Sequence, residues 1–244
     1  MRMAFLSILC AVSALALAPS LRSEDGGDAS GDAKGPKIPA NVPKEVRDMI
    51  ERVKMLDEKS AYKELIRGIQ AGNKTRVKVI LFVFPKFFNK PDAFGRTPLY
   101  NAVFAGKKDL VKYFLAKGAA IMKEDVDGNT PLHRAAANGD VEMIKMLLDK
   151  GSNIYLRNKK GRTPIFLAAS NGRAEAVKYL ISQGARANKK DDRDDTPLHL
   201  AAISGDAATV EALLEKGADK NAKNKRGKTP EDVAREDAVR NLLK

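Results

Sequence analysis

The sequence has very few of the side chains on which enzymes and zinc sites most often depend. Its 244 residues include one cysteine, Cys10, two histidines, His133 and His199, and no tryptophan. No nucleophile elbow is present, and no cysteine–histidine spacing of a zinc site occurs. We therefore expect no enzymatic activity, no metal ion and no cofactor.

Long apolar runs are also lacking, apart from one at the N-terminus. Residues 4–18 ("AFLSILCAVSALALA") follow Arg2 and carry no charge. The run is long enough for a signal peptide and short for a membrane span, which needs about 20 residues. We predict a signal peptide over residues 1–18, cleaved between 16 and 20, and a secreted or periplasmic protein whose mature chain has no membrane span. An uncleaved anchor is the alternative.

If this signal peptide is cleaved, cysteine chemistry is also excluded from the mature chain. Cys10 lies inside the predicted signal peptide, so cleavage leaves no cysteine to form a disulfide. The stability of the folded part must then come from packing. Residues 19–42 are rich in Gly, Ala, Asp, Ser and Pro, with little to bury, and are predicted to form a disordered linker.

A repeat with a period of 33 residues occupies most of the remaining chain. Thr-Pro pairs begin at Thr97, Thr130, Thr163, Thr196 and Thr229. Glycines recur nine and twenty-one residues after the threonine, and an Asp or Asn lies five residues before it. The threonine suits a helix N-cap, the proline suits the first helical turn, and the glycines suit helix ends with positive φ. One unit therefore predicts a helix, a turn, a second helix and a hairpin.

The residues of this unit resemble the ankyrin repeat, for example in residues 125–154 ("DVDGNTPLHRAAANGDVEMIKMLLDKGSNI"). The resemblance implies an all-α ankyrin repeat solenoid of helix-turn-helix units with β-hairpin loops. Four full repeats are expected within residues 92–223, at 92–124, 125–157, 158–190 and 191–223. Residues 43–91 are predicted to form an extra helix and a degenerate capping repeat, and 224–244 a truncated C-terminal capping repeat.

The histidines occupy one position of the repeat, which Tyr100 and Phe166 fill in the other two full units. In the ankyrin family this histidine joins the threonine to neighbouring hairpins by hydrogen bonds. Stacked helix layers lie about 8–10 Å apart, so His133 and His199 should be roughly 20 Å from each other. They cannot share a substrate or a metal ion, and we expect them to be structural.

Other fragments imitate functional motifs but lack a required residue. Residues 227–229 ("GKT") resemble the end of a phosphate-binding loop, whose first glycine is replaced by Ala222. Residues 125–129 and 191–195 suggest calcium loops, but neither has the closing glutamate. All three fall where the repeat predicts a hairpin.

The family resemblance implies that a partner binds the concave face, made of hairpin tips and the first helix of each unit. Applied to this sequence, it gives the candidate residues Phe94, Arg96, Phe104, Val126, Asn138, Lys159, Lys160, Arg162, Arg193, Ile203, Lys225 and Arg226. The two phenylalanines have no core role in the repeat and are candidate anchors. Alternatively, they pack on the aromatic segment 84–88, and the basic tip residues are simply solvated.

Three functions compete for this face. The first is a scaffold that binds a partner protein in an exported compartment and is itself a monomer. The second is a module that binds a polyanion such as nucleic acid, an acidic glycan or lipopolysaccharide, which the formal charge of +13 favours. The alternating sign of charge along the face argues against the second. The third is an enzyme of unrecognised type. We favour the scaffold.

Overall fold

A computed structural model describes residues 36, 38, 39 and 41–244. The predicted signal peptide lies outside the described residues, as does most of the predicted linker. The chain forms two compact units, of which the first ends at Lys90 and the second spans Pro91–Lys244. Within the described residues the secondary structure is helical, with no β-strand. None of these helices is long and apolar enough to cross a membrane.

The first unit contains three α-helices and a short 3₁₀ helix. These are α2 (Lys44–Lys54), α3 (Glu58–Ala71), α4 (Lys74–Val83) and η2 (Pro85–Phe87). In α2 the apolar stripe of Val46, Ile50 and Val53 is buried. Both α2 and α3 pack against α4. An extra helix is therefore present at the start of residues 43–91, and it packs on α4.

The second helix of the first unit ends differently from those of the full repeats. The place of the repeat's second glycine is taken by Phe84, whose φ of −122° is an ordinary value for an L-residue. The chain then turns through η2 and buries Phe87 against the rings of Tyr62 and Phe84, at centroid distances of 5.2 and 5.0 Å. The Tyr62 hydroxyl donates to the carbonyl of Lys90 at 2.7 Å. The aromatic segment 84–88 thus helps form the core of this first unit.

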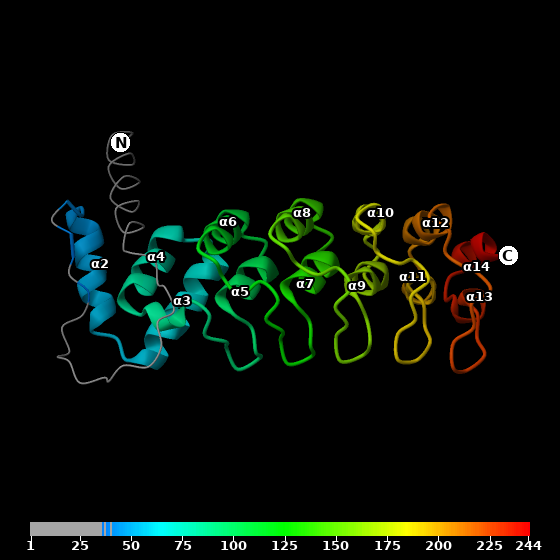
Figure 1. Cartoon of the computed structure of the whole chain (residues 1–244), viewed down its shortest axis with the longest axis horizontal. Helices are drawn as coiled ribbons and strands as arrows, with labels where there is room; N and C mark the ends of the chain where they lie inside the picture. Colours follow the sequence, from blue (N-terminus) through cyan, green and yellow to red (C-terminus); the bar gives the residue numbers. More distant parts are fainter. Residues whose placement is uncertain (1–35, 37, 40) are drawn as a thin grey trace. The chain divides into compact units, whose positions relative to one another are not determined.

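The second unit is a stack of five helix pairs that follow one another in chain order (Figure 1). The pairs are α5 (Pro98–Phe104) with α6 (Lys108–Ala116), α7 (Pro131–Asn138) with α8 (Val141–Asp149), α9 (Pro164–Ser170) with α10 (Ala174–Ser182), α11 (Pro197–Ser204) with α12 (Ala207–Glu215), and α13 (Pro230–Val233) with α14 (Asp237–Leu243). The first helix of each pair belongs to one row and the second to another, and a hairpin loop precedes each helix of the first row. We call these the inner row and the outer row.

The helix boundaries are those that the repeat predicts. The five repeat threonines are the N-cap residues of the inner-row helices, and each is followed by proline in the first turn. Gly139 ends α7 with φ of 78°, and Gly151 follows α8 with φ of 88°. Both values lie in the left-handed region that only glycine adopts at little cost.

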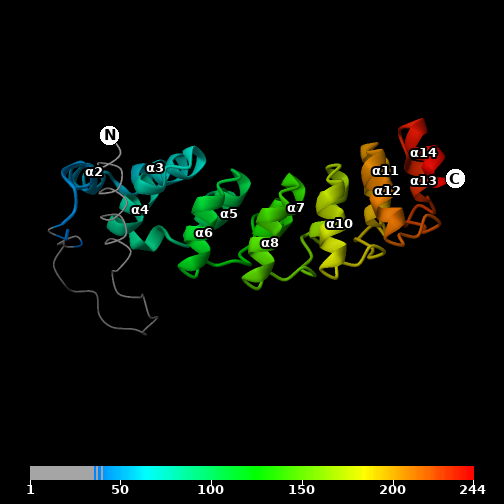
Figure 2. The ribbon, with the colours of Figure 1, turned by 90° about the horizontal axis from the view of Figure 1, so that it is seen from above.

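Stacking holds these short helices together. The helices of the four full repeats have seven to nine residues, and isolated helices of this length are not stable in water. Ala135 and Ala136 are fully buried, as are Ala168 and Ala169 in the next repeat. Because these side chains are small, α7 and α9 pack closely, and the view from above shows the pairs side by side (Figure 2). The paired alanines therefore allow successive inner-row helices to pack closely.

The hairpin loops are joined to one another through the backbone. Each loop is closed between its first and fifth residues, as in the bond from the N–H of Asp125 to the carbonyl of Asn129 at 2.9 Å. One further bond joins each loop to the next, beginning with the N–H of Val126 and the carbonyl of Phe94 at 2.9 Å. The loops are therefore evenly spaced, although no strand is assigned to them in the described residues.

The C-terminal pair ends the stack with a polar surface. Thr229 caps α13, and the carboxylate of Asp232 accepts from the backbone N–H of Thr229 at 2.9 Å. Asp232, Glu236 and Asp237 are exposed, and Glu231 is half-buried. A polar surface of this kind is what a capping repeat requires for solubility.

Candidate partner-binding face

The hairpin loops and the adjacent ends of the inner-row helices form one surface of the second unit, which we call the hairpin face. Its loops are residues 92–96, 125–129, 158–162, 191–195 and 224–228. In each loop the side-chain oxygen of the opening Asp or Asn accepts backbone N–H groups of the same loop, as Asp92 does from Phe94 and Arg96 at 2.9 and 3.0 Å. The side chains at the second, third and fifth positions of each loop are thereby held at its surface.

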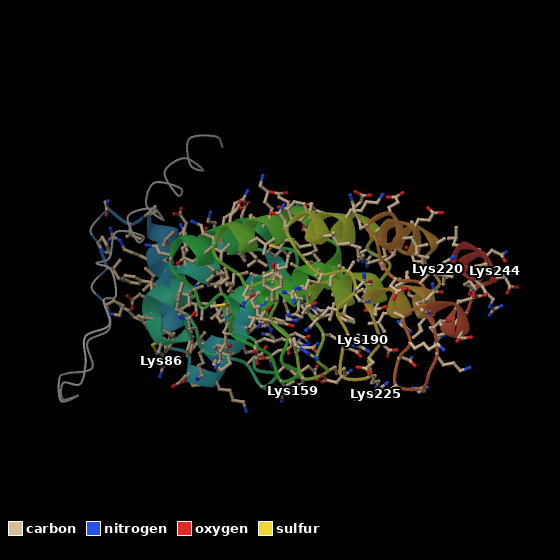
Figure 3. The ribbon with its side chains drawn as sticks, turned by 45° about the vertical axis from the view of Figure 1, so that its right-hand side comes forward. Lys86, Lys159, Lys190, Lys220, Lys225 and Lys244 are labelled. Carbon is tan, nitrogen blue, oxygen red and sulfur yellow. The ribbon has the colours of Figure 1, made fainter. Side chains whose placement is uncertain are left out.

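Most of the twelve candidate residues are accessible on this face. Phe94, Val126 and Phe104 are 56%, 50% and 42% exposed. The other exposed candidates are Asn138, Lys159, Lys160, Arg193, Lys225 and Arg226, and the half-buried ones are Arg96, Arg162 and Ile203. Figure 3 shows Lys159 and Lys225 near the ends of two of the loops.

Two candidates also hold neighbouring repeats together. The Nε atom of Arg162 lies 2.8 Å from the carboxylate of Asp191, whose side chain is only 1% exposed. The amide of Asn138 donates to the carbonyl of Val103 at 3.2 Å. Arg162 and Asn138 therefore have structural partners already, whereas the lysines at the loop tips are open to solvent.

The histidines are structural, as expected. The Nδ1 atom of His133 accepts the backbone N–H of Thr130 at 3.2 Å, so its Nε2–H donates to the carbonyl of Arg162 at 3.0 Å. The same pair of bonds joins His199 to Thr196 and to the carbonyl of Lys228. Burial lowers the pKa of His133, which keeps its ring neutral and both bonds intact at neutral pH.

An aromatic and arginine cluster lies at the start of the hairpin face. The guanidinium carbon of Arg96 is 4.9 Å from the ring centre of Phe94 and 5.0 Å from that of Phe104. The guanidinium carbon of Arg134 is 3.9 Å from the same Phe104 ring. Two positive charges and two exposed rings are thus brought together from one loop and two successive inner-row helices.

The comparison with known families agrees with this geometry. A family model described as ankyrin repeats, in three copies, matches residues 65–158 and 150–224. The match covers more than half of the chain. This chain belongs to the ankyrin repeat family.

Ankyrin repeats generally mediate protein–protein interaction, and proteins built from them are typically not catalysts. No curated protein matches the chain. The candidate face on this ankyrin stack must therefore be interpreted from its own residues.

The sequence prediction omitted one residue of the cluster, Arg134. It lies in α7 at a position where the next two ankyrin repeats have Leu167 and Leu200. An arginine that replaces leucine inside a repeat pattern could have identified it. Burial lowers the pKa of Arg134, and the charge of Arg96 lowers it further. The two guanidinium groups are therefore close enough to repel each other.

Arg96 and Arg134 have no hydrogen bond or ion pair from their side chains in the part of the chain that the structure describes. Their Nε atoms are shielded from solvent and have no hydrogen-bond partner there. The charge of Asp125 raises the pKa of Arg134, so this acid lies near enough to attract the guanidinium. Its oxygens, however, already accept bonds from Tyr100, Asp127 and Asn129.

One loop of the ankyrin stack carries a strained backbone. Asp194 stands where the other loops have glycine, and it is the one non-glycine residue with positive φ in the described chain, at 60°. A left-handed conformation costs an L-residue about 1–2 kcal/mol, less for aspartate than for most residues. Sequence reasoning placed a hairpin here but did not identify this strain.

The first unit has a concave feature of its own, in which one carboxylate is paired with two arginines. A groove of about 780 Å³ is lined by residues of α2, α3 and α4. Within it, Glu64 forms ion pairs of 2.6 Å with both Arg67 and Arg76. No group of three or more Asp, Glu, His or Cys side chains in the described residues is arranged to hold a metal ion.

Proposed function

We propose that this ankyrin repeat protein is a non-catalytic scaffold that binds a partner protein through the hairpin face of residues 91–244. The observation that carries this proposal is the grouping of exposed apolar side chains at one end of that face. Of the large apolar residues that are exposed in the described chain, Phe94 and Phe104 belong to one cluster, and Val126 is joined to Phe94 through the backbone. Aromatic side chains surrounded by arginine are typical anchors of protein interfaces.

The structure of the loops supports this proposal. Backbone bonds between successive loops hold the anchors at fixed positions before a partner arrives. A preorganised surface loses little conformational entropy on binding, so more of the contact energy contributes to affinity. We expect the scaffold itself to be a monomer.

Binding of a polyanion is the second candidate, and the charge distribution on the hairpin face disfavours it. Basic tips at Lys159, Lys160, Lys225 and Arg226 are separated by the acidic loop 191–195. Arg162 and Arg157 are held by Asp191 and Asp192 at 2.8 Å each. A nucleic acid or acidic glycan that followed the face would therefore meet both signs of charge.

The test is affinity capture with the full chain from an extract of its own compartment. The parent is compared with a triple variant that carries Phe94→Ala, Phe104→Ala and Lys159→Glu. We expect one protein that the parent retains in about 1 M salt, where charges are screened beyond about 3 Å, and that the variant loses. Capture at low salt alone, with nucleic acid or glycan in the eluate, favours the polyanion function and contradicts the scaffold.

We also propose that the scaffold acts in an exported compartment. The support is the uncharged run of residues 4–18 and the small residues Ala16 and Ala18 near its end. The test is N-terminal sequencing of the protein from its source. Cleavage between residues 16 and 20 is expected. A chain that keeps residues 1–18 and stays in the cytosolic fraction excludes export.

A further inference from the structure

The aromatic and arginine cluster differs from the equivalent positions of the later repeats. In those repeats, the fifth residue of each loop bonds to the Asp or Asn that opens the next loop. Asn129 accepts from Asn158 at 2.8 Å, Arg162 donates to Asp191 at 2.8 Å, and Asp195 accepts from Asn224 at 2.7 Å. Arg96 occupies the same position in the first loop but makes no such bond to Asp125.

Tyr100 explains why Arg96 is free. Its hydroxyl donates to a carboxylate oxygen of Asp125 at 2.6 Å. Tyrosine replaces the histidine of the repeat, and its hydroxyl reaches the side chain that Arg96 would otherwise contact. Arg96 instead stacks over Phe94 and Phe104, where Arg134 joins it.

The two arginines lack a compensating acid. Both guanidinium carbons lie within 5.0 Å of the Phe104 ring centre, and neither side chain has an ion pair among the described residues. Each guanidinium presents a planar fork of N–H donors that matches a carboxylate. A carboxylate that reached both would relieve their repulsion and satisfy donors that the protein leaves open.

The surroundings favour a peptide rather than a polyanion. Phe94 and Val126 are joined through their backbones and expose 56% and 50% of their surface beside the arginines. Asp127, in the same loop as Val126, is exposed and negative, so it repels a chain of closely spaced phosphates. A single carboxylate beside an apolar side chain fits this combination of charges and surfaces.

We propose that Arg96 and Arg134 bind an Asp or Glu side chain of an acidic segment in the partner protein, while an adjacent apolar side chain of that segment packs on Phe94 and Val126. This proposal rests on the proposed function, because it names the part of the partner that the hairpin face recognises. The two arginines and Phe104 are called the arginine clamp below.

The probe for the test is a library of random peptides, selected against the full chain. Bound peptides are synthesised with a fluorophore and a C-terminal amide, and their affinity is measured by fluorescence anisotropy. We expect selected sequences to contain Asp or Glu next to aromatic or aliphatic residues. Replacement of that acid by its amide should weaken binding at least tenfold, which is about 1.4 kcal/mol.

The variants separate the arginine clamp from general electrostatics. The double variant Arg96→Gln with Arg134→Gln should lose at least tenfold in affinity and should no longer distinguish the acidic peptide from its amide. The matched control, Lys225→Gln with Arg226→Gln, removes the same charge from exposed residues of the last loop and should change affinity less than threefold. Arg134→Lys keeps the charge without the planar fork and should give an intermediate loss of peptide affinity. Thermal unfolding checks that all variants fold.

Each other outcome overturns the proposal. Equal loss in the two double variants shows that net charge alone attracts the peptide. Peptides that bind without an acid, but are lost on Phe104→Ala, exclude recognition of a carboxylate by Arg96 and Arg134 and leave the protein-binding function standing. Displacement of the peptides by heparin or RNA at equal affinity indicates a polyanion site. If no peptide is selected and no protein is captured through the hairpin face, both proposals are overturned.

Discussion

The hydroxyl of Tyr100 lies 2.6 Å from a carboxylate oxygen of Asp125, and this bond links the first full repeat to the second. In the second and fourth repeats a histidine makes the link instead, by donating to a backbone carbonyl. The change from histidine to tyrosine moves the link from the backbone to a side chain. It thereby occupies Asp125, whose equivalent in a later loop, Asp191, accepts a bond from Arg162.

The first prediction concerns this bond. Tyr100→Phe removes a hydrogen bond to a buried carboxylate, a loss of about 1.5–3 kcal/mol that a new bond from Arg96 would offset in part. Arg96 can then turn toward Asp125, as Arg162 does toward Asp191, and affinity for an acidic peptide should fall. Urea unfolding and fluorescence anisotropy measure the two effects.

Tyr100→His is the matched comparison for this prediction. It restores the residue of the second and fourth repeats and the bonds that His133 makes, so stability should recover. Asp125 still lacks the hydrogen bond from the tyrosine hydroxyl, so Arg96 can turn toward it and affinity for the acidic peptide should remain low. Full affinity in both variants would show that Tyr100 does not control Arg96.

A second prediction concerns His133. The third repeat has a phenylalanine, Phe166, at this position. His133→Phe should therefore fill the same space, but the Thr130 N–H and the Arg162 carbonyl lose their hydrogen bonds to the imidazole ring. We expect a loss of about 1–3 kcal/mol in the free energy of unfolding and unchanged peptide affinity. Loss of all binding in a folded variant would contradict a structural role for His133.

The same histidine predicts a dependence on pH. Burial lowers the pKa of His133 in the folded state below the unfolded value of about 6.5. The unfolded chain therefore binds the proton more tightly, and this contribution to stability is complete above pH 6.5 and is lost as pH falls below it. Unfolding free energies measured between pH 7.5 and 5 should decline more steeply for the parent than for His133→Phe. Parallel declines would show that this histidine does not titrate as described.

The strained loop provides a prediction of increased stability. Asp194→Gly removes a side chain from a residue with φ of 60° and should stabilise the protein by about 1 kcal/mol. Asp194→Ala keeps a Cβ and loses the charge, so it should not stabilise. Thermal unfolding of the three proteins distinguishes backbone strain from charge, and a gain shared by both variants would indicate charge.

Gly139 provides the opposite test. Its φ of 78° suits glycine alone, and an added Cβ would lie 2.7 Å from the side chain of Arg173. Gly139→Val should therefore unfold or strongly destabilise the stack. Gly217→Ala is a milder control, because no atom lies within 4 Å of the added Cβ, although its φ of 77° is still unfavourable. An unchanged midpoint for Gly139→Val would contradict the repeat register.

The fold was predictable from sequence because each repeated residue has a local role. A threonine before a proline caps a helix, and a glycine with positive φ ends one, whatever the neighbouring repeat contains. The capping residues Thr97 to Thr229 therefore follow from the period alone. The degenerate first unit was less predictable, since Phe84 replaces a glycine and, like Tyr62, packs against Phe87.

The candidate site was only partly predictable for a corresponding reason. The exposed loop residues follow from repeat position, which placed Phe94, Arg96 and Phe104 on the face. Arg134 was omitted from the prediction. The sequence shows that it replaces leucine in the repeat pattern, but its contact with the Phe104 ring is visible only in the structure. Nor could the sequence show that Arg162 is ion-paired while Arg96 is free, because this difference depends on the hydroxyl of Tyr100.

The most direct measurement is photo-crosslinking of the captured partner from chosen positions on the full chain. Benzoylphenylalanine replaces Phe94 or Phe104 on the hairpin face, or Tyr155, which is 55% exposed in the segment that follows α8. The scaffold function predicts adducts with the partner from positions 94 and 104 and none from 155. Adducts from position 155 alone would contradict the hairpin face as the binding surface.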